Sequence, residues 1–495
     1  MGPRGQGGVG GARLLIRPAP RRGPGQRPGG GRDDRLARPP RGGRPAIDPA
    51  REAAYEAVAA VHRDDAYANL VLPGLLRENG VSGRDAAFAT ELTYGTLRQT
   101  GTLDAIVAAA ADRAMDRIDP PVRDALRIGA YQLLHMRVGA HAAVATTVDL
   151  VRSLVPGAAG FANAVLRRVG ESDRAAWLQR LAPADPVARA ALVHAHPAWI
   201  VNAFADALGS LDEAELALDA DNLPPPVHLC ARPGLIDPAD LAASLHGAAV
   251  GRYSPYAVVL SGGGDPSSIP AIREGRAHVQ DEGSQLVAAV LADADLDGPD
   301  ERWLDLCAGP GGKAGLLGAL AATRDAHVTA AEVAHHRAAL VAKATQGLPV
   351  FTINADGRDV GKDPDLPEAS FDRVLVDAPC TGLGALRRRP EARWRRQPSD
   401  LPPLTRLQRE LLQSAFRAVR PGGVVAYVTC SPHQAETEVS VTEAARRSSI
   451  EVDLVDARPY LPASLPETGT GPTVQLWPHR HGTDAMFVAL LRRTA

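Results

Sequence analysis

Cysteine and aromatic residues are scarce in this chain of 495 residues. Aromatic side chains make up 4% of the sequence, and the four cysteines are Cys230, Cys307, Cys380 and Cys430. Cysteines so few and so widely separated argue against a disulfide scaffold and against a zinc-binding motif. We therefore expect no metal site and reduced thiols, with Cys230 and Cys307 serving as small core residues.

Long apolar runs are also missing, although hydrophobic residues make up 45% of the sequence. No stretch reaches the roughly 18 apolar residues of a membrane-spanning helix. The short run between Arg13 and Arg17 is not long enough for the apolar core of a secretory signal. We therefore expect a cytoplasmic protein without a membrane partner, and we expect it to be a monomer.

Lysine is almost absent, because only Lys313, Lys343 and Lys362 are lysines among the 55 basic residues. Residues 1–45 contain eleven arginines and two aspartates, a net charge of +9, so the other residues must carry −11 to give the formal total of −2. This Gly- and Pro-rich segment predicts a disordered basic arm. The arm either binds nucleic acid weakly or is a solvated tail without a specific role.

The length predicts about three folded domains. Residues 46–172 repeat Ala and Leu every three or four positions, which predicts an all-α domain, with one helix beginning at Asp119-Pro120-Pro121. Residues 173–283 predict a helical connector and a small α+β module with a helix near 238–245. Residues 284–495 predict a Rossmann-like α/β domain with a parallel sheet. Its expected strands lie near 303–307, 327–332, 350–354, 374–377 and 423–429, with a closing strand near 486–491.

A glycine-rich loop, Ala308 to Lys313, follows the first of these strands and precedes a helical run. Its glycines lack the spacing of the dinucleotide fingerprint and of the P-loop. A nucleotide-like cofactor without a phosphate to cradle fits better, and we expect S-adenosylmethionine. A lysine kept in this loop indicates a need for a compact ammonium, unless its position is chance.

Acidic residues follow the next three predicted strands. Glu332 lies about 20 residues past the loop, where a carboxylate can accept both ribose hydroxyls of a nucleoside. Asp356 is suited to meet an adenine amino group, and Asp377 follows the fourth strand. Each acid alone could be a solvated loop charge, but their order along the chain favours one cofactor site.

Cys380 and Cys430 each come just after a predicted buried strand. Parallel sheets bind ligands at the carboxyl ends of their strands, so both thiols are predicted to lie beside the cofactor. The C5 atom of cytosine is a poor nucleophile, and adding a thiolate at C6 makes it reactive toward a methyl sulfonium. A second group must then assist release of the product. The spacing leaves open which of the two thiols attacks.

The segment between the thiols contains six arginines around one tryptophan. Guanidinium groups suit phosphates, and the indole could stack on a base or pack the loop. The alternative is a solvated charged loop. The predicted RNA-binding residues are Arg387, Arg388, Arg389, Arg393, Trp394 and Arg396.

Two resemblances extend this interpretation. Residues 53–169 resemble the NusB fold, a helical RNA-binding domain, through residues 85–92, 94–98, 126–134 and 161–168. The alternative is a helical bundle that only packs on its neighbour. Residues from about 196 onward resemble RNA (cytosine-5) methyltransferases of the Nop/Sun family, through residues 280–285, 306–313, 377–384 and 427–431. Together they make the chain after residue 45 similar to the RsmB/Fmu type of that family, which modifies bacterial small-subunit (16S) ribosomal RNA.

The resemblance implies a role for each matching position. Cys430 would be the attacking nucleophile, Cys380 would assist product release, and Asp377 would also lie near the cytosine ring. The implied S-adenosylmethionine-binding residues are Cys307, Ala308, Gly309, Pro310, Gly311, Gly312, Lys313, Glu332, Asp356 and Asp377. The chain departs from the family at Thr437, where asparagine is usual after the glutamate.

Two alternatives stay open at this point. The catalytic motifs do not encode the target, so a transfer-RNA cytosine methyltransferase is possible on sequence alone. A catalytically dormant RNA-binding or assembly factor is the other alternative, although intact Cys380, Cys430 and Lys313 argue against it.

Overall fold

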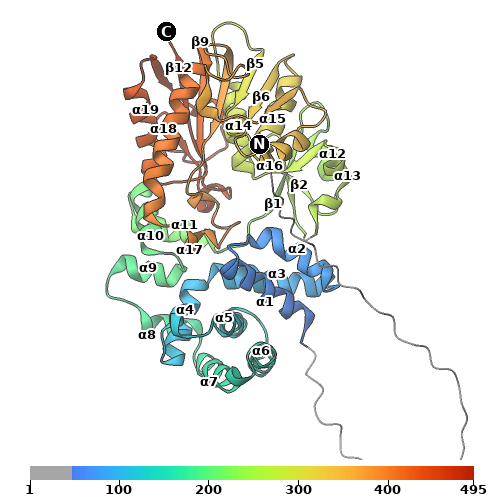
Figure 1. Cartoon of the computed structure of the whole chain (residues 1–495), viewed down its shortest axis with the longest axis vertical. Coiled ribbons are helices and arrows are strands. Elements are labelled where there is room, and N and C mark those ends of the chain that lie inside the picture. Colours follow the sequence, from blue (N-terminus) through green and yellow to red (C-terminus); the bar gives the residue numbers. More distant parts are fainter. Residues whose placement is uncertain (1–46, 263, 495) are drawn as a thin grey trace, which may run out of the picture. The chain divides into compact units, whose positions relative to one another are not determined.

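The computed structural model describes residues 47–262 and 264–494 (Figure 1). The basic arm predicted for residues 1–45 lies outside these residues. Within the described ranges, no helix combines the length and apolar character needed to cross a membrane.

The first folded region is all-α, as the sequence predicts. Its apolar helix faces share one core that includes Leu92, Leu103, Leu126 and Leu166. The predicted helix start is confirmed, because a helix begins at Pro120 with Asp119 as its N-cap. The helices are α1 (Pro49–Arg63), α2 (Ala68–Glu78), α3 (Gly83–Arg98), α4 (Thr100–Ala111), α5 (Pro120–His135), α6 (Ala140–Leu154) and α7 (Ala159–Val169).

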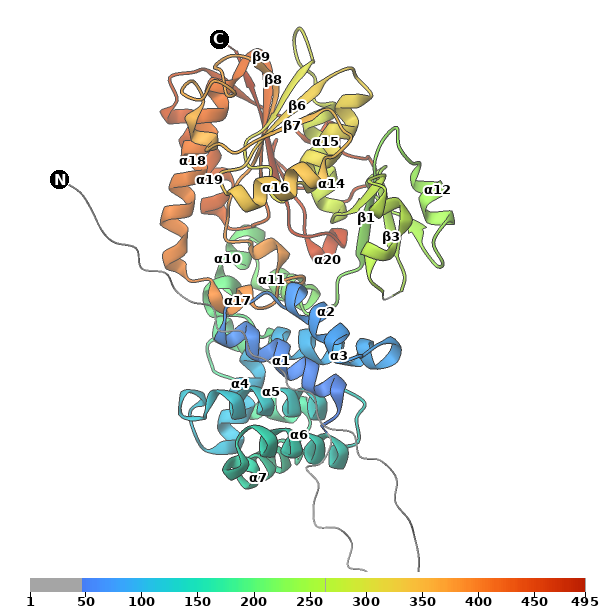
Figure 2. The same ribbon diagram turned by 45° about the vertical axis from the view of Figure 1, so that its right-hand side comes forward.

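A helical connector follows, formed by α8 (Arg174–Leu181), α9 (Pro186–His194), α10 (Ala198–Leu208) and α11 (Leu211–Asp221). Phe204 and Leu218 of the connector share a core with Leu383, Leu386 and Trp477 from the C-terminal part of the chain. Both ribbon views accordingly show α10 and α11 beside α17 (Ala392–Arg395) (Figures 1 and 2). The connector therefore packs directly against the segment that follows Cys380.

The small α+β module is a four-stranded sheet of order β2-β3-β1-β4. Its strands are β1 (Val227–Ala231), β2 (Ala249–Val250), β3 (Ala257–Leu260) and β4 (Ala277–Val279), with α12 (Pro238–Ala243) and α13 (Pro270–Arg273) beside them. The helix predicted near 238–245 is confirmed by α12. Cys230 in β1 is fully buried, as expected of a core residue.

The C-terminal region is an α/β sheet of order β10-β12-β9-β8-β5-β6-β7, with β11 (Val474–Gln475) paired to β12. Five strands of this sheet pair with one another in parallel. They are β5 (Arg302–Asp305), β6 (His327–Ala331), β7 (Val350–Ile353), β8 (Phe371–Asp377) and β9 (Val419–Thr429). The closing strand β12 (Phe487–Arg493) runs antiparallel to β9, and β10 (Val452–Val455) pairs with β12. All six predicted strands are found within a few residues of their expected bounds.

Helices cover both faces of this sheet (Figure 1). One core joins the sheet to α14 (Glu282–Asp293) and α15 (Gly312–Ala322), and α16 (His335–Ala344) packs beside the glycine loop. The other core joins it to α18 (Leu401–Ala418) and α19 (Glu438–Arg447). A four-residue helix, α20 (Pro478–His481), precedes β12. The strand order reverses between β5 and β8, which is where open α/β sheets bind ligands.

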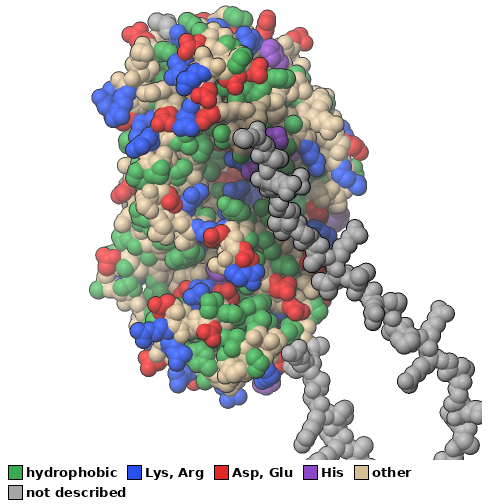
Figure 3. All heavy atoms as spheres, in the orientation of Figure 1, with side chains coloured by type: hydrophobic (Ala, Val, Ile, Leu, Met, Phe, Trp, Pro, Cys, Tyr) green, Lys and Arg blue, Asp and Glu red, His purple; other side chains and the backbone are tan. Residues whose placement is uncertain are grey.

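Acidic and basic side chains are interspersed on the molecular face drawn in Figure 3. That face therefore offers RNA no broad field of positive charge, and basic groups must be sought locally.

Candidate active site

The glycine-rich loop joins β5 to α15 and requires glycine at two positions. Gly311 has a φ of +108°, a conformation that side chains disfavour. A Cβ atom on Gly309 would lie 2.1 Å from Oε2 of Glu332. The loop can therefore approach the end of β6 closely only because Gly309 has no side chain.

Glu332 and Asp356 follow β6 and β7. The buried Glu332 carboxylate accepts hydrogen bonds from the backbone N–H groups of Gly309, at 3.1 Å, and Ala334, at 2.9 Å. Asp356 forms an ion pair of 2.6 Å with Arg358, whose hydrogen bonds hold the pKa of Asp356 below its usual range. Both acids thus sit at strand ends, as their sequence positions predict.

A cavity of about 520 Å³ opens at these strand ends. It brings together side chains and backbone from all the predicted strand-end features. The residues that line it include Cys307, Gly309, Glu332, Asp356, Asp377, Cys380 and Cys430. Cys307 is therefore half-buried beside the cavity rather than enclosed in the core.

The two predicted active-site thiols are neighbours in this cavity. The Sγ atoms of Cys380 and Cys430 lie 3.5 Å apart, close enough to share a hydrogen bond. That bond, helped by the nearby charge of Lys313, lowers the pKa of the Cys430 thiol below its ordinary value. The same bond, together with burial, raises the pKa of Cys380 well above its ordinary value. Cys430 is therefore the thiol that ionises first.

Lys313 provides a fixed positive charge beside the thiols. Its Nζ atom lies 2.9 Å from Oδ2 of Asp377, the last residue of β8. Burial alone would lower the pKa of Lys313, but the Asp377 carboxylate outweighs burial and the net shift is upward. Lys313 thus stays protonated, as the sequence argument for a compact ammonium requires.

Asp305, at the end of β5, is a buried acid that the sequence did not single out. Burial, followed by the charge of Asp377, raises its pKa to about 7. Its carboxylate accepts a hydrogen bond of 3.2 Å from the backbone N–H of Cys307. This hydrogen bond therefore holds the start of the glycine-rich loop at the end of β5.

Glu436 is a second buried acid whose role the sequence did not reveal. Its carboxylate accepts hydrogen bonds from the backbone N–H of Thr381, at 2.8 Å, from the Thr381 hydroxyl, and from the Ser431 hydroxyl, at 2.7 Å. The Gln408 side chain also donates to it, at 3.1 Å. Because Thr381 follows Cys380 and Ser431 follows Cys430, one carboxylate holds both thiol-bearing loops.

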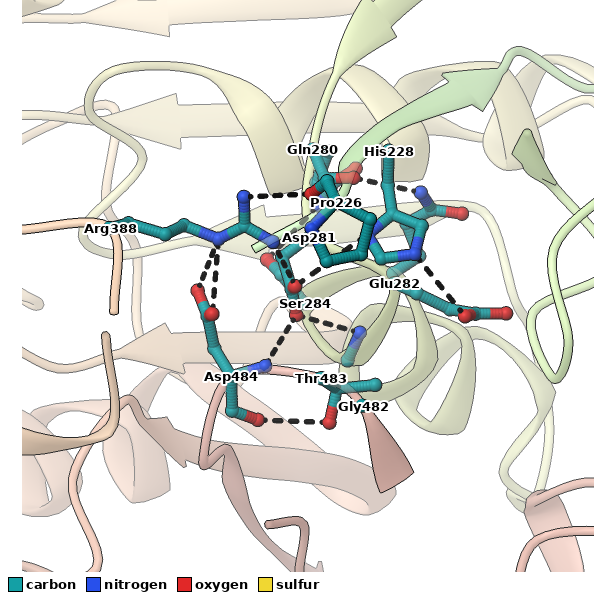
Figure 4. Close-up of polar contacts among 12 residues, drawn as sticks. Pro226, His228, Gln280, Asp281, Glu282, Ser284, Arg388, Gly482, Thr483 and Asp484 are labelled. Carbon is teal, nitrogen blue, oxygen red and sulfur yellow. Dashed lines mark hydrogen bonds and ion pairs between the residues drawn. The ribbon is translucent and has the colours of Figure 1, made fainter. Parts of the chain in front are cut away.

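Arg387, one of the predicted RNA-binding residues, has acidic partners inside the protein. Arg387 is buried and donates to Asp484, at 2.7 Å, and to Asp281, at 2.9 Å. Arg388 lies between the same two acids, with contacts of 3.0 and 2.6 Å (Figure 4). These guanidiniums neutralise buried carboxylates, and His228 of β1 faces the same cluster at 3.8 Å from Asp281. The cluster therefore ties the small module to the catalytic domain.

Arg393 and Trp394, which the sequence predicts to bind RNA, contact the helical domain through their side chains. Arg393 is completely buried and donates to the backbone oxygen of Arg98, at 2.9 Å, and to Asn222, at 2.7 Å. Trp394 packs so closely on Gly101 of α4 that a Cβ there would lie 2.3 Å from its ring. Both residues therefore join α17 to the helical domain.

Arg389 and Arg396 do line the cavity, together with Arg395. Arg396 donates to the backbone oxygen of Thr381 at 3.0 Å, and Arg389 is exposed. The same wall includes Tyr67, which immediately precedes α2 in the helical domain. Nothing in the sequence around Tyr67 predicts this position.

Comparison with known proteins agrees with this architecture. Residues 295–492 match the family 16S rRNA methyltransferase RsmB/F, and residues 48–171 match the NusB family. A Mycobacterium tuberculosis protein named as a methyltransferase is 57% identical over 452 residues, covering 90% of this chain and 97% of that protein. The ribosomal RNA small subunit methyltransferase B of Yersinia enterocolitica is 31% identical, covering 89% of this chain and 98% of that protein.

Among solved structures, the crystal structure of PH0851 superposes with a TM-score of 0.75 at 24% identity. It covers 91% of this chain and 100% of that one, so it shares the fold from the helical domain onward. These matches confirm the resemblance drawn from the sequence motifs. The chain belongs to the RsmB/F family and is an S-adenosylmethionine-dependent RNA methyltransferase.

Proposed function

We propose that this protein methylates C5 of a cytosine in small-subunit (16S) ribosomal RNA through a covalent bond to Cys430. The observation that carries the proposal is the pair of thiols 3.5 Å apart in the cavity beside the glycine loop. A methyltransferase that acts on a nucleophilic nitrogen or oxygen needs no thiol, whereas the C5 carbon of cytosine needs one. The RsmB/F family match and the name of the Yersinia relative support the ribosomal target.

The residues around the loop fit S-adenosylmethionine. The cavity is within the size range of cofactor sites, and Gly309 lets the loop backbone approach a ligand. We propose that Glu332 binds the ribose hydroxyls and that Asp356 lies near the adenine. The full proposed set is Cys307, Ala308, Gly309, Pro310, Gly311, Gly312, Lys313, Glu332, Asp356 and Asp377. When bound, the cofactor supplies the methyl group.

The chain's own side chains would then act in sequence. The Cys430 thiolate bonds to C6, which breaks the C5–C6 double bond and makes C5 nucleophilic. The Lys313 ammonium favours that thiolate, and Asp377, held by Lys313, is available to bind the cytosine ring. After methyl transfer, the C5 proton must leave to a base while the S–C6 bond breaks and its electron pair returns to Cys430. Cys380, adjacent to Cys430, is the group we assign to this release step.

Two cysteine variants test the proposal. Cys430→Ala should abolish methyl transfer, whereas Cys380→Ala should let a protein–RNA adduct accumulate as a slow-migrating band on a denaturing gel. Cys230→Ala, which removes a buried thiol of the small module, serves as the matched control and should show neither effect. If Cys430→Ala trapped RNA and Cys380→Ala were simply inactive, the roles would be reversed.

The RNA target needs a separate measurement. Bisulfite sequencing of ribosomal and transfer RNA, with and without the gene, should show loss of a methylated cytosine in small-subunit ribosomal RNA only. Loss confined to transfer RNA would favour the alternative substrate. No loss in either RNA would favour the dormant factor, against which the intact thiol pair and Lys313–Asp377 ion pair argue.

A further inference from the structure

Tyr67 is an aromatic residue of the helical domain that reaches the catalytic cavity. It is the N-cap residue of α2, in an extended conformation, and its side chain is 43% exposed. It lines the same cavity as Cys380 and Cys430, which come from the other end of the chain. An exposed tyrosine on the wall of a cavity offers an apolar surface and a polar tip at once.

Two guanidiniums lie over the Tyr67 ring. The Cζ atoms of Arg389 and Arg395 are 5.6 and 5.3 Å from the ring centroid, within the range of cation–π attraction. Arg395 is fixed in place, because it donates to the backbone oxygens of Val61 and Ala66. Arg389 is exposed and has no ion pair within 4.0 Å among the described residues, although its charge acts on the Glu391 carboxyl, so its guanidinium can reach a ligand.

The segment that carries Arg389 and Arg395 contacts both the helical domain and the loop after Cys380. Arg393 and Trp394, in the same segment as the two arginines, pack against the end of α3 and the start of α4, and Arg393 is fully buried there. Arg396 binds the backbone oxygen of Thr381, next to Cys380. One short segment therefore connects the helical domain to the loop of a proposed catalytic thiol, and Tyr67 lines the same cavity as that thiol.

We infer that Tyr67 and Arg389 form a grip for the single-stranded RNA that flanks the target cytosine, so that the helical domain completes the substrate site. The inference rests on the proposed function, in which RNA is the substrate. A base taken out of its stack leaves neighbouring bases and phosphates that a protein must hold, and aromatic rings and guanidiniums are the groups that hold them.

Variants of the full-length protein test this grip by two measurements. One is the Kd for a short single-stranded RNA oligonucleotide, and the other is the KM for unmethylated small-subunit ribosomal RNA. Tyr67→Leu keeps the apolar bulk but removes the aromatic face, and it should weaken both by about 5- to 150-fold, the effect of losing one stacked base. Tyr67→Trp should restore both to within about threefold of wild type, because an indole stacks at least as well.

Arg389→Gln should reduce the slope of log Kd against log salt by about 0.7, the loss of one phosphate contact on a single strand. Leu70→Ala is the matched control, since Leu70 is 71% exposed on the same helix but does not line the cavity. S-adenosylmethionine binding, measured by calorimetry, should be unchanged in every variant and reports correct folding.

Wild-type RNA affinity in Tyr67→Leu, with the cofactor still bound, would overturn the inference. So would equal losses in Tyr67→Leu and Tyr67→Trp, since these would indicate a packing role at the domain contact. The binding measurement needs no turnover. If wild type left all RNA unmethylated, the proposed function would fail while oligonucleotide binding still decided the grip.

Discussion

Glu436 provides the sharpest test of how the two thiols are held. Its carboxylate is the common acceptor for Thr381 and Ser431, the residues that follow the two cysteines. Glu436→Gln keeps the volume but replaces one acceptor oxygen with an NH₂ donor. We expect the thiol-bearing loops to shift relative to each other while the sheet and the cofactor loop stay intact.

The magnitude follows from the contacts that change. The hydroxyls of Thr381 and Ser431 lie 3.2 Å apart and can bond to each other, and Gln408 keeps its bond to the backbone oxygen of Pro379. Glu436→Gln should therefore lose mainly one charge-assisted hydrogen bond, about 1.5–3 kcal/mol of stability. Glu436→Ala also orphans the buried Thr381 N–H, which adds about 1–3 kcal/mol. A displacement of about 1 Å at a reacting group can lower kcat about 100-fold, so activity should fall far more than stability.

The thiol chemistry should change as well. A hydrogen bond to Cys430 and burial raise the pKa of Cys380, and the charge of Glu436 adds to that rise. Without this charge the pKa of Cys380 should fall, and the difference in pKa between the two thiols should shrink. Alkylation by iodoacetamide, followed over a range of pH and read by peptide mass spectrometry, should show Cys380 reacting at a lower pH than in wild type.

The assay combines urea unfolding, kcat for ribosomal RNA and the KM for S-adenosylmethionine. Glu438→Gln, two residues along and exposed, is the matched control. The expected result is a kcat about 100-fold lower in Glu436→Gln, with the KM for the cofactor within about twofold of wild type. Wild-type kcat and an unchanged alkylation profile in that variant would refute the argument.

Three further predictions concern the loop, the nucleophile and the domain contact. Gly309→Ala should weaken S-adenosylmethionine binding at least about tenfold by calorimetry, because its Cβ would displace Glu332, whereas Gly160→Ala in α7, where an added Cβ meets nothing within 4 Å, should not. Since the pKa of Cys430 is lowered, its alkylation rate should rise with pH through a midpoint pH below that of an ordinary thiol. Cys380→Ala removes the hydrogen bond to Cys430 and should move this midpoint to a higher pH, and an unchanged midpoint would contradict that bond. Burial raises the pKa of Asp221 to about 7, so the folded state keeps a proton that the unfolded state releases, and stability falls as pH rises from about 4 to about 7. Asp221→Asn should therefore raise Tm at pH 8 and make little difference at pH 4, and a lower Tm at both pH values would disprove this.

Much of the catalytic domain could be predicted because its signals are local. Five strands alternate with helices, and acidic or thiol side chains such as Glu332, Asp377 and Cys430 end these strands or follow them. The glycine-rich loop can be recognised from Gly309 and Gly311, because a close approach at Gly309 and the backbone conformation of Gly311 exclude side chains. Parallel strands then bring their ends to one edge without any further information. This rule alone is enough to predict that both thiols lie beside the glycine-rich loop.

The role of the buried acid Glu436 could not be assigned from the sequence, because it depends on hydrogen bonds that Glu436 accepts from distant residues. Glu436 follows Cys430 closely in sequence, yet two of its donors come from Thr381 and Gln408. When no sequence motif surrounds a glutamate, the sequence cannot distinguish a solvated carboxylate from one that holds two loops together. Tyr67 could not be identified for the same reason, since its neighbours in the cavity lie more than two hundred residues away in the sequence.

The arginine-rich segment shows why charge alone misleads. Each guanidinium carries the same charge and the same five donors, so the sequence 387–396 predicts six equivalent phosphate ligands. Their environments separate them, because Arg387 meets two buried aspartates, Arg393 meets backbone oxygens at two helix ends, and Arg389 meets only a tyrosine ring. A buried charge must have partners, and supplying them consumes the donors that RNA would need. The segment therefore uses some of its arginines to fix the helical domain against the catalytic loops, and only those left at the cavity wall are free to bind a substrate.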